Sequence, residues 1–275
     1  MSFLQTIFLG IVQGLTEFFP VSSSGHLVVI ESFFKNFHRP GILFEILLHV
    51  ATLVPVFIYF RKELYQIIEG LWNWKSDSTD LSFSRGRKVF FMLIVGSIPT
   101  ALIGFAFKDT FERLFSTPAL VLVALCLTGG LLWFASRRLN TTRRLDEITI
   151  RDALLIGTFQ GVAITPGISR SGATIAMGLL CGLDPVASAA YSFLLSIPAI
   201  SGAALLEMRH FNLLLQPGAN IAAMLAGALV ASVVGYLAIR YLIKLLSLKR
   251  LSLFAWYCWF FALIAGLLLF FRGKI

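Results

Sequence analysis

A polar run near the N-terminus carries side chains that act together in hydroxyl catalysis. Gln13 and Glu17 lie four residues apart and therefore share one face of a helix. Ser22, Ser23 and His26 follow. A serine becomes an effective nucleophile only when a nearby base accepts its proton, so a serine, an imidazole and a carboxylate form a plausible set. Glu17, with Gln13 beside it, is also a candidate ligand for Mg²⁺ or Ca²⁺, because Mg²⁺ is usually held by one or two carboxylates together with substrate phosphates.

A second polar run, residues 166–174, favours the binding of an anion. Ser169 or Ser171 can cap the helix that follows, and a helix N-terminus attracts phosphate through its free N–H groups and its dipole. Arg170 adds a planar fork of donors that matches phosphate oxygens. Thr174 adds a hydroxyl one turn later on the same face. The two runs together predict a site for phosphoryl transfer.

Both runs also have a structural interpretation. Arg170 can pair with a carboxylate and hold two helices together, since an arginine in the hydrocarbon region costs about 2.5–3.5 kcal/mol on insertion scales. The serines can act only as caps, and His26 can form a structural hydrogen bond with Glu17. Glu45 and His49, one turn apart, are weaker candidates. Glu45 is either a second cation ligand or a side chain that reaches the membrane interface.

The remaining histidines and the cysteines carry no site in this interpretation. His38 and His210 fall in polar segments between apolar stretches and are expected to be solvated. Cys126, Cys181 and Cys258 are isolated within apolar stretches and lack metal-ligand spacing, so neither a disulfide framework nor a metal site is expected.

The elements that must position these side chains are membrane helices. The chain has 275 residues, of which 57% are hydrophobic and only 13% are charged, whereas soluble domains average about 25% charged residues. The net charge of +9 lies in short segments between apolar stretches, which argues against a nucleic-acid partner. Stretches near the roughly 20 apolar residues that a membrane crossing needs occur at 42–60, 88–107, 117–135, 186–206, 220–240 and 251–271.

The two polar runs interrupt apolar segments 3–37 and 152–183, which do not fit simple crossings. Irregular backbone at membrane depth is tolerated only where it is buried in protein or lines a cavity. We therefore predict an all-α integral membrane protein with six full transmembrane helices and two re-entrant helix–loop–helix hairpins. The two segments align without gaps at an offset of 147: Gly10, Gln13, Gly14, Ser22, Ser24 and Gly25 match Gly157, Gln160, Gly161, Ser169, Ser171 and Gly172.

This alignment predicts an inverted-topology repeat within a single membrane domain, with repeat 1 at about 1–135 and repeat 2 at about 150–275. Three full spans separate the copies, and an odd number inverts the second, so that the broken helices meet near the bilayer midplane. The paired glycines in each hairpin predict close helix packing.

Lysine and arginine counts orient the chain. Loops 61–88, 136–151 and 240–250 hold fifteen, and the loops and terminus on the other side hold seven. The first side is therefore expected to be cytoplasmic, with both termini outside.

The two runs closely resemble the signature motifs of the bacterial undecaprenyl-diphosphate phosphatases, the bacitracin-resistance family. The matching segments are Glu17-Phe-Phe-Pro-Val-Ser-Ser-Ser-Gly-His26 and Pro166-Gly-Ile-Ser-Arg-Ser-Gly-Ala-Thr174, and the resemblance extends over essentially the whole chain. It implies hydrolysis of a C55 lipid diphosphate to the monophosphate and phosphate, which recycles the lipid carrier for cell-wall synthesis. It also implies a divalent cation and a site in the bacterial inner membrane that opens to the periplasmic side.

The resemblance also assigns roles to individual residues. Position 13 is Gln where many relatives carry a second Glu, which bears on whether a two-carboxylate cation site forms. His49 stands where Gln is expected, and no role follows for it. The motif positions implicated in catalysis or diphosphate binding are Glu17, Ser23, His26, Ser169, Arg170 and Thr174.

A membrane lipid-diphosphate phosphatase is the leading hypothesis. A transporter or flippase of an anionic lipid or solute is the alternative, because inverted repeats with broken helices are typical of secondary transporters. The Ser/His/Glu set favours the enzyme, since transport needs charge compensation but no nucleophile. We predict that Ser23 attacks the terminal phosphorus with His26 as its base, while Ser22 and Ser169 serve as matched caps. Ser22 is the rival nucleophile, and a cation-bound water is the rival mechanism.

Overall fold

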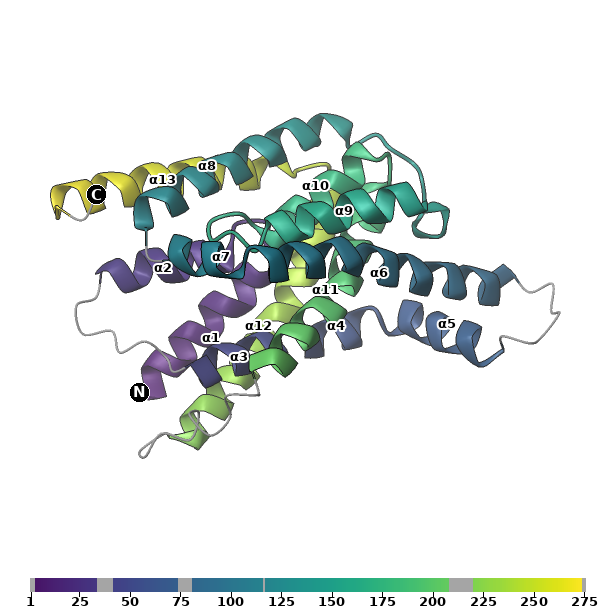
Figure 1. Cartoon of the computed structure of the whole chain (residues 1–275), viewed down its shortest axis with the longest axis horizontal. Helices are drawn as coiled ribbons and strands as arrows, with labels where there is room; N and C mark the ends of the chain where they lie inside the picture. The colour runs from purple at the N-terminus through teal and green to yellow at the C-terminus, as the bar shows by residue number, and fades with distance from the viewer. Residues whose placement is uncertain (1–2, 34–41, 74–80, 116, 208–219, 274–275) are drawn as a thin grey trace.

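The computed structural model describes residues 3–33, 42–73, 81–115, 117–207 and 220–273, and this part of the chain is a bundle of helices (Figure 1). The predicted all-α class is confirmed. Cys126, Cys181 and Cys258 are free, while His38 and His210 lie outside the described residues. The helices are α1 (Phe3–Phe18), α2 (Ser23–Phe33), α3 (Ile42–Ala51), α4 (Leu53–Tyr59), α5 (Arg61–Trp72), α6 (Leu81–Ala106), α7 (Lys108–Phe115), α8 (Pro118–Ala135), α9 (Ile150–Val162), α10 (Arg170–Leu180), α11 (Pro185–Glu207), α12 (Ile221–Ser247) and α13 (Ser252–Phe271), with short 3₁₀ turns at Ser136–Arg138 and Leu145–Glu147.

Five of the predicted spans are confirmed as helices that are long and apolar enough to cross a membrane, namely α6, α8, α11, α12 and α13. The stretch predicted as the first span, 42–60, is different. It is divided into α3 and α4, and the chain then bends by 80° into α5, so these helices count at most as one broken span. The described part of the chain thus has five such helices, or six if the bent pair is one span.

Pro55 explains the break between α3 and α4. Proline has no N–H, so the carbonyl of Ala51 loses its helical partner. Ser232 on α12 replaces that partner, since its hydroxyl donates to the Ala51 carbonyl at 2.7 Å. Thr52 donates to the carbonyl of His49 at 2.6 Å. The polar backbone that the break exposes is therefore satisfied inside the protein, as a membrane environment requires.

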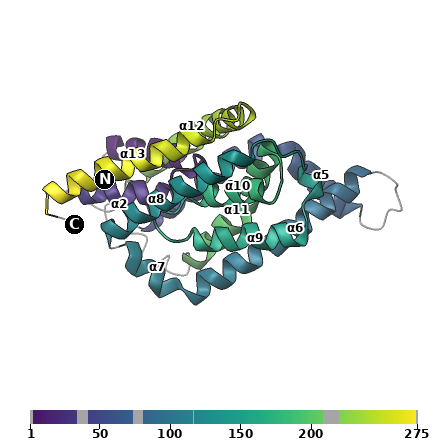
Figure 2. The same ribbon diagram turned by 90° about the horizontal axis from the view of Figure 1, so that it is seen from above.

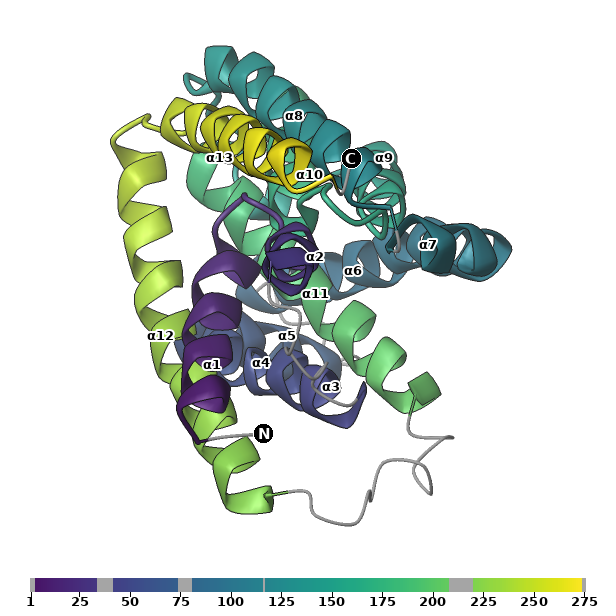
Figure 3. The ribbon, with the colours of Figure 1, turned by 90° about the vertical axis from the view of Figure 1, so that its left-hand side faces the viewer.

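The two polar runs form helix–loop–helix hairpins, α1–α2 and α9–α10. The second helices begin at Ser23 and Arg170, which are separated by the same offset of 147 that aligns the sequences. Each first helix lies along a long helix from the other half of the chain: α1 packs on α12, and α9 packs on α6 (Figures 1 and 3).

Glycines permit these two close packings. A methyl group added at Gly10 would overlap the carbonyl of Gly227 on α12, and one added at Gly157 would overlap the carbonyl of Gly96 on α6. The predicted role of the hairpin glycines in close helix approach is confirmed at both positions.

Helix α11 has a fully enclosed segment, because every residue from 187 to 196 is buried. It packs against α3, α4, α6, α10 and α12. Helices α8 and α13 lie side by side along one edge of the bundle, and α5 with the start of α6 extends from one end (Figures 1 and 2). Leucines such as Leu102, Leu229 and Leu263 are more than half exposed on the outer helices, as expected of a surface that faces lipid.

Candidate active site where the two hairpins meet

Glu17, at the end of α1, is the centre of the polar cluster between the hairpins. Its side chain is only 6% exposed. Oε1 accepts from Nη2 of Arg170 at 2.8 Å. Oε2 accepts from Nε2 of Gln13 at 3.0 Å and from Oγ of Ser23 at 3.1 Å. The carboxylate therefore joins the first helix and the loop end of one hairpin to the first residue of α10 in the other.

Arg170 is held from two directions. Besides Glu17, it reaches the backbone carbonyl of Ser192 on α11, with Nη1 at 3.4 Å from the oxygen. Pairing with a carboxylate is what the structural interpretation of Arg170 expects, and it is present here. The ion pair also holds Arg170 at the N-terminus of α10, where an anion is favoured. Its guanidinium has five N–H donors in a planar fork.

Ser22 and Ser169 cap the second helix of each hairpin, which confirms that they are matched. The N–H of Gly25 donates to Oγ of Ser22 at 3.2 Å, and the N–H of Gly172 donates to Oγ of Ser169 at 3.0 Å. Their backbones differ, however. Ser169 has φ −74°, whereas Ser22 has φ +68°, a left-handed conformation that costs a non-glycine residue about 1–2 kcal/mol.

The predicted diphosphate-binding hydroxyls of the second hairpin already have protein partners. Ser171 donates to the carbonyl of Phe19 at 3.2 Å and so links the two hairpin loops. Thr174 is fully buried, donates to the Arg170 carbonyl at 2.8 Å and shares a hydrogen bond with Ser192. Both residues hold Arg170 and the loop in place, and their contact with a substrate stays a prediction.

His26 lies on α2 with both ring nitrogens engaged. Nδ1 is 2.8 Å from the carbonyl oxygen of Ser22, and Nε2 is 2.8 Å from the hydroxyl of Tyr257 on α13. The hydroxyl of Ser23 donates to Glu17. We expected Ser23 to pair with His26, but among the described residues Ser23 binds Glu17 and His26 binds Ser22 and Tyr257. Glu17 is therefore the group positioned to accept the Ser23 proton.

Comparison with known proteins identifies the chain as a whole. Residues 6–264 match the model of the family described as bacitracin resistance protein BacA. The chain belongs to this family. Among its relatives, the undecaprenyl-diphosphatase of Carboxydothermus hydrogenoformans is 40% identical over 94% of both chains. The undecaprenyl-diphosphatase of Desulforapulum autotrophicum is 40% identical over 96% of this chain and 98% of its own.

A BacA-family site with a single carboxylate raises the question of how it would hold a cation. No group of three or more His, Cys, Asp or Glu gathers in the described part of the chain. The carbonyl oxygen Oε1 of Gln13 is, however, buried with no hydrogen-bond partner among those residues. A neutral oxygen beside the Glu17 carboxylate suits Mg²⁺ or Ca²⁺, which bind oxygen ligands. The residues present therefore fit a cation that also binds substrate phosphates.

Two weaker candidates lie on α3. Nε2 of His49 is 3.7 Å from Oε2 of Glu17, so this side chain borders the site. Glu45 is partly buried one turn earlier, and its role as a cation ligand stays a prediction.

Three residues at the site were missed from the sequence. Thr128 on α8 accepts from the N–H of Ser169 at 3.1 Å and donates to the carbonyl of Gly167 at 3.0 Å, so it fixes the second loop. Ser192 and Tyr257 contact Arg170 and His26. For Thr128 and Ser192 the available signal was a polar side chain within an apolar span, which is costly without a partner, whereas the half-exposed Tyr257 gave no such signal.

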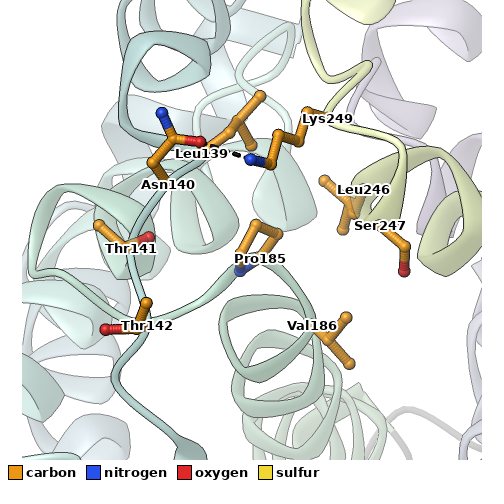
Figure 4. Close-up of a pocket in the computed structure, with 9 residues that line it drawn as sticks. All are labelled: Leu139, Asn140, Thr141, Thr142, Pro185, Val186, Leu246, Ser247 and Lys249. Atoms are coloured by element: carbon orange, nitrogen blue, oxygen red, sulfur yellow. Dashed lines mark hydrogen bonds between the residues drawn. The ribbon is translucent and has the colours of Figure 1, made fainter.

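A separate cavity of about 260 Å³ opens between residues 139–142, the start of α11 and the end of α12 (Figure 4). Lys249 at its edge donates to the side-chain oxygen of Asn140. No residue of either hairpin loop lines this cavity, so it is distinct from the cluster around Glu17.

Proposed function

We propose that this chain is a membrane phosphatase that removes the terminal phosphate of undecaprenyl diphosphate and releases the lipid monophosphate for reuse in cell-wall synthesis. The family and the names of the relatives support this substrate. The observation that carries the proposal is that one buried carboxylate, Glu17, binds both a serine hydroxyl and a guanidinium. A phosphatase needs a nucleophile and an anion-binding group at one point, whereas an anion transporter needs only the latter.

Arg170 and the capped helix start bind the terminal phosphate. Arg170 can exchange its partner Glu17 for phosphate oxygens, which its planar fork fits in a bidentate manner. The N-termini of α2 and α10, capped by Ser22 and Ser169, offer further N–H groups to the diphosphate. Ser171 and Thr174 hold that arrangement and contribute hydroxyls at the anion.

Ser23 and Glu17 carry out the two chemical steps. Oγ of Ser23 attacks the terminal phosphorus, and the bond from phosphorus to the bridging oxygen breaks. Glu17 takes the hydroxyl proton and passes it to the leaving lipid phosphate. A water then attacks the phosphoserine, Glu17 accepts its proton, and the proton returns to Oγ as phosphate leaves.

A divalent cation, Mg²⁺ or Ca²⁺, belongs to the same proposal. Glu17 and Oε1 of Gln13 are the groups that would hold it, with Glu45 as a further candidate. When bound, such a cation neutralises charge on the phosphate oxygens.

The proposed topology is six spans and two re-entrant hairpins in the bacterial inner membrane, with the site open to the outer side. Two observations support it. The distribution of lysine and arginine places loops 61–88, 136–151 and 240–250 on the cytoplasmic side. The packing of α1 on α12 and of α9 on α6 pairs each hairpin with the opposite half of the chain in the same way, which favours a repeat whose halves meet at a shared site.

Phosphate release tests the proposal. The purified protein in detergent is supplied with undecaprenyl diphosphate and Mg²⁺ or Ca²⁺, and inorganic phosphate is measured over time. We expect catalytic release from the diphosphate and none from undecaprenyl phosphate. A folded protein that releases no phosphate from the diphosphate with either cation would contradict the proposal.

A further inference from the structure

Ser22 and its counterpart Ser169 cap equivalent helices with different backbones. Ser22 is left-handed at φ +68°, and its counterpart Ser169 is not, at φ −74°. The next turn differs as well, because position 26 is His while the equivalent position 173 is Ala. The first hairpin therefore combines a strained cap with an imidazole that the second hairpin lacks.

The His26 side chain holds the strained residue. A carbonyl oxygen only accepts, so Nδ1 of His26 carries the hydrogen in its 2.8 Å contact with the Ser22 carbonyl. The backbone N–H of His26 reaches the same oxygen at 3.2 Å. A residue in a sparsely populated conformation persists only when its surroundings fix it, and here the imidazole is one of the groups that do so.

Tyr257 on α13 in turn fixes the imidazole. With Nδ1 protonated, Nε2 of the neutral ring is an acceptor, and the Tyr257 hydroxyl donates to it at 2.8 Å. The His26 ring also stacks on Tyr257, with the planes 9° apart, and on Phe261, with the centroids 4.1 Å apart. The ring is thus held in one orientation and one tautomer by α13.

The position of Ser23 depends on this chain of contacts. Ser23 follows Ser22 directly, so the left-handed turn sets the direction in which its Oγ leaves the backbone toward Glu17. We infer that Tyr257 is a positioning residue for the phosphoryl transfer, acting through His26 and Ser22 to keep the Ser23 hydroxyl on the Glu17 carboxylate. This inference rests on the proposed function, since it assigns Ser23 the role of nucleophile.

Tyr257→Phe tests the inference because it removes the hydroxyl and keeps the ring stack. Loss of one hydrogen bond that holds a reactive geometry should lower kcat by about five- to tenfold, with KM for undecaprenyl diphosphate changed less than twofold. Tyr241→Phe is the matched control. Tyr241 is similarly exposed, at 53% against 45%, and its ring is near Phe19 of the same hairpin. It should keep kcat within twofold of wild type.

A double-mutant cycle separates positioning from a general loss of structure. Glycine adopts positive φ without strain, so in a Ser22→Gly background the turn no longer needs the imidazole. Tyr257→Phe should then lower kcat by less than twofold, and any effect of Ser22→Gly by itself cancels in the ratio.

Three outcomes are decisive. A much smaller loss in the Ser22→Gly background supports the positioning role. An equal loss in both backgrounds, or no loss from Tyr257→Phe alone, overturns it. If the wild-type protein releases no phosphate, the proposed function fails instead, which keeps the two failures distinguishable.

Discussion

Arg170→Lys keeps the positive charge at the site and removes the planar fork. Arg170 contacts Glu17 through Nη2 at 2.8 Å and the Ser192 carbonyl through Nη1 at 3.4 Å. A lysine ammonium is a point charge that cannot bind two phosphate oxygens in parallel. Loss of one charge-assisted hydrogen bond to the phosphate in the transition state corresponds to about 1.5–3 kcal/mol. Since each 1.36 kcal/mol is tenfold in rate, kcat/KM should fall by roughly 10- to 150-fold.

The assay is phosphate release from undecaprenyl diphosphate by purified protein, normalised to folded protein measured by size-exclusion chromatography. Arg143→Lys is the matched control. Arg143 donates to Asp152 and to the Cys181 carbonyl, both at 2.7 Å, and contacts none of the residues around Glu17 among the described contacts. This change should lower stability but leave kcat/KM per folded molecule within threefold. Near-normal turnover by Arg170→Lys would refute the assignment of Arg170 to the phosphate.

Three further predictions concern the cation, the topology and the packing. Glu17→Gln or EDTA should lower phosphate release by at least about 100-fold; full activity of Glu17→Gln would remove Glu17 from the mechanism, and full activity in EDTA would remove the cation. Single cysteines introduced at 61–88 or 136–151, in a background without the native cysteines, should react only with reagents on the cytoplasmic side; labelling of the second loop from outside would contradict the inverted repeat. Gly157→Ala should lower the melting temperature by several degrees, because its methyl group would overlap the Gly96 carbonyl on α6, and an unchanged melting temperature would show that the helices do not pack this closely.

The sequence predicted the hairpins well because their polar residues cannot face lipid. The breaks before Ser23 and Arg170, the matched caps and the close glycine contacts follow from serine, proline and glycine in apolar surroundings. The break in the first predicted span was missed. A proline inside an apolar run is compatible with a continuous helix when neighbours satisfy the freed carbonyl. Ser232 does this at Thr52, where the interruption is a single residue with helical dihedral angles, and the 80° bend follows only after Tyr59.

The site was predicted less completely. Glu17 and Arg170 were each identified, but their direct contact bridges 153 positions and no local pattern reports it. The spacing of Ser23 and His26 predicted a shared helix face, yet the left-handed Ser22 at the helix start precedes both, and Tyr257 engages the imidazole from 231 positions away. Local spacing describes a regular helix, and it does not describe the irregular residue that precedes one.

Turnover by Ser23→Ala tests the central claim most directly, with Ser22→Ala measured beside it. If Ser23 is the nucleophile, Ser23→Ala should lose about four orders of magnitude or more in kcat, while its affinity for undecaprenyl diphosphate stays within threefold of wild type. Ser22→Ala should lose far less, because it removes a cap and keeps the nucleophile. A Ser23→Ala protein that retains turnover within tenfold of wild type would contradict the account and favour attack by a cation-bound water.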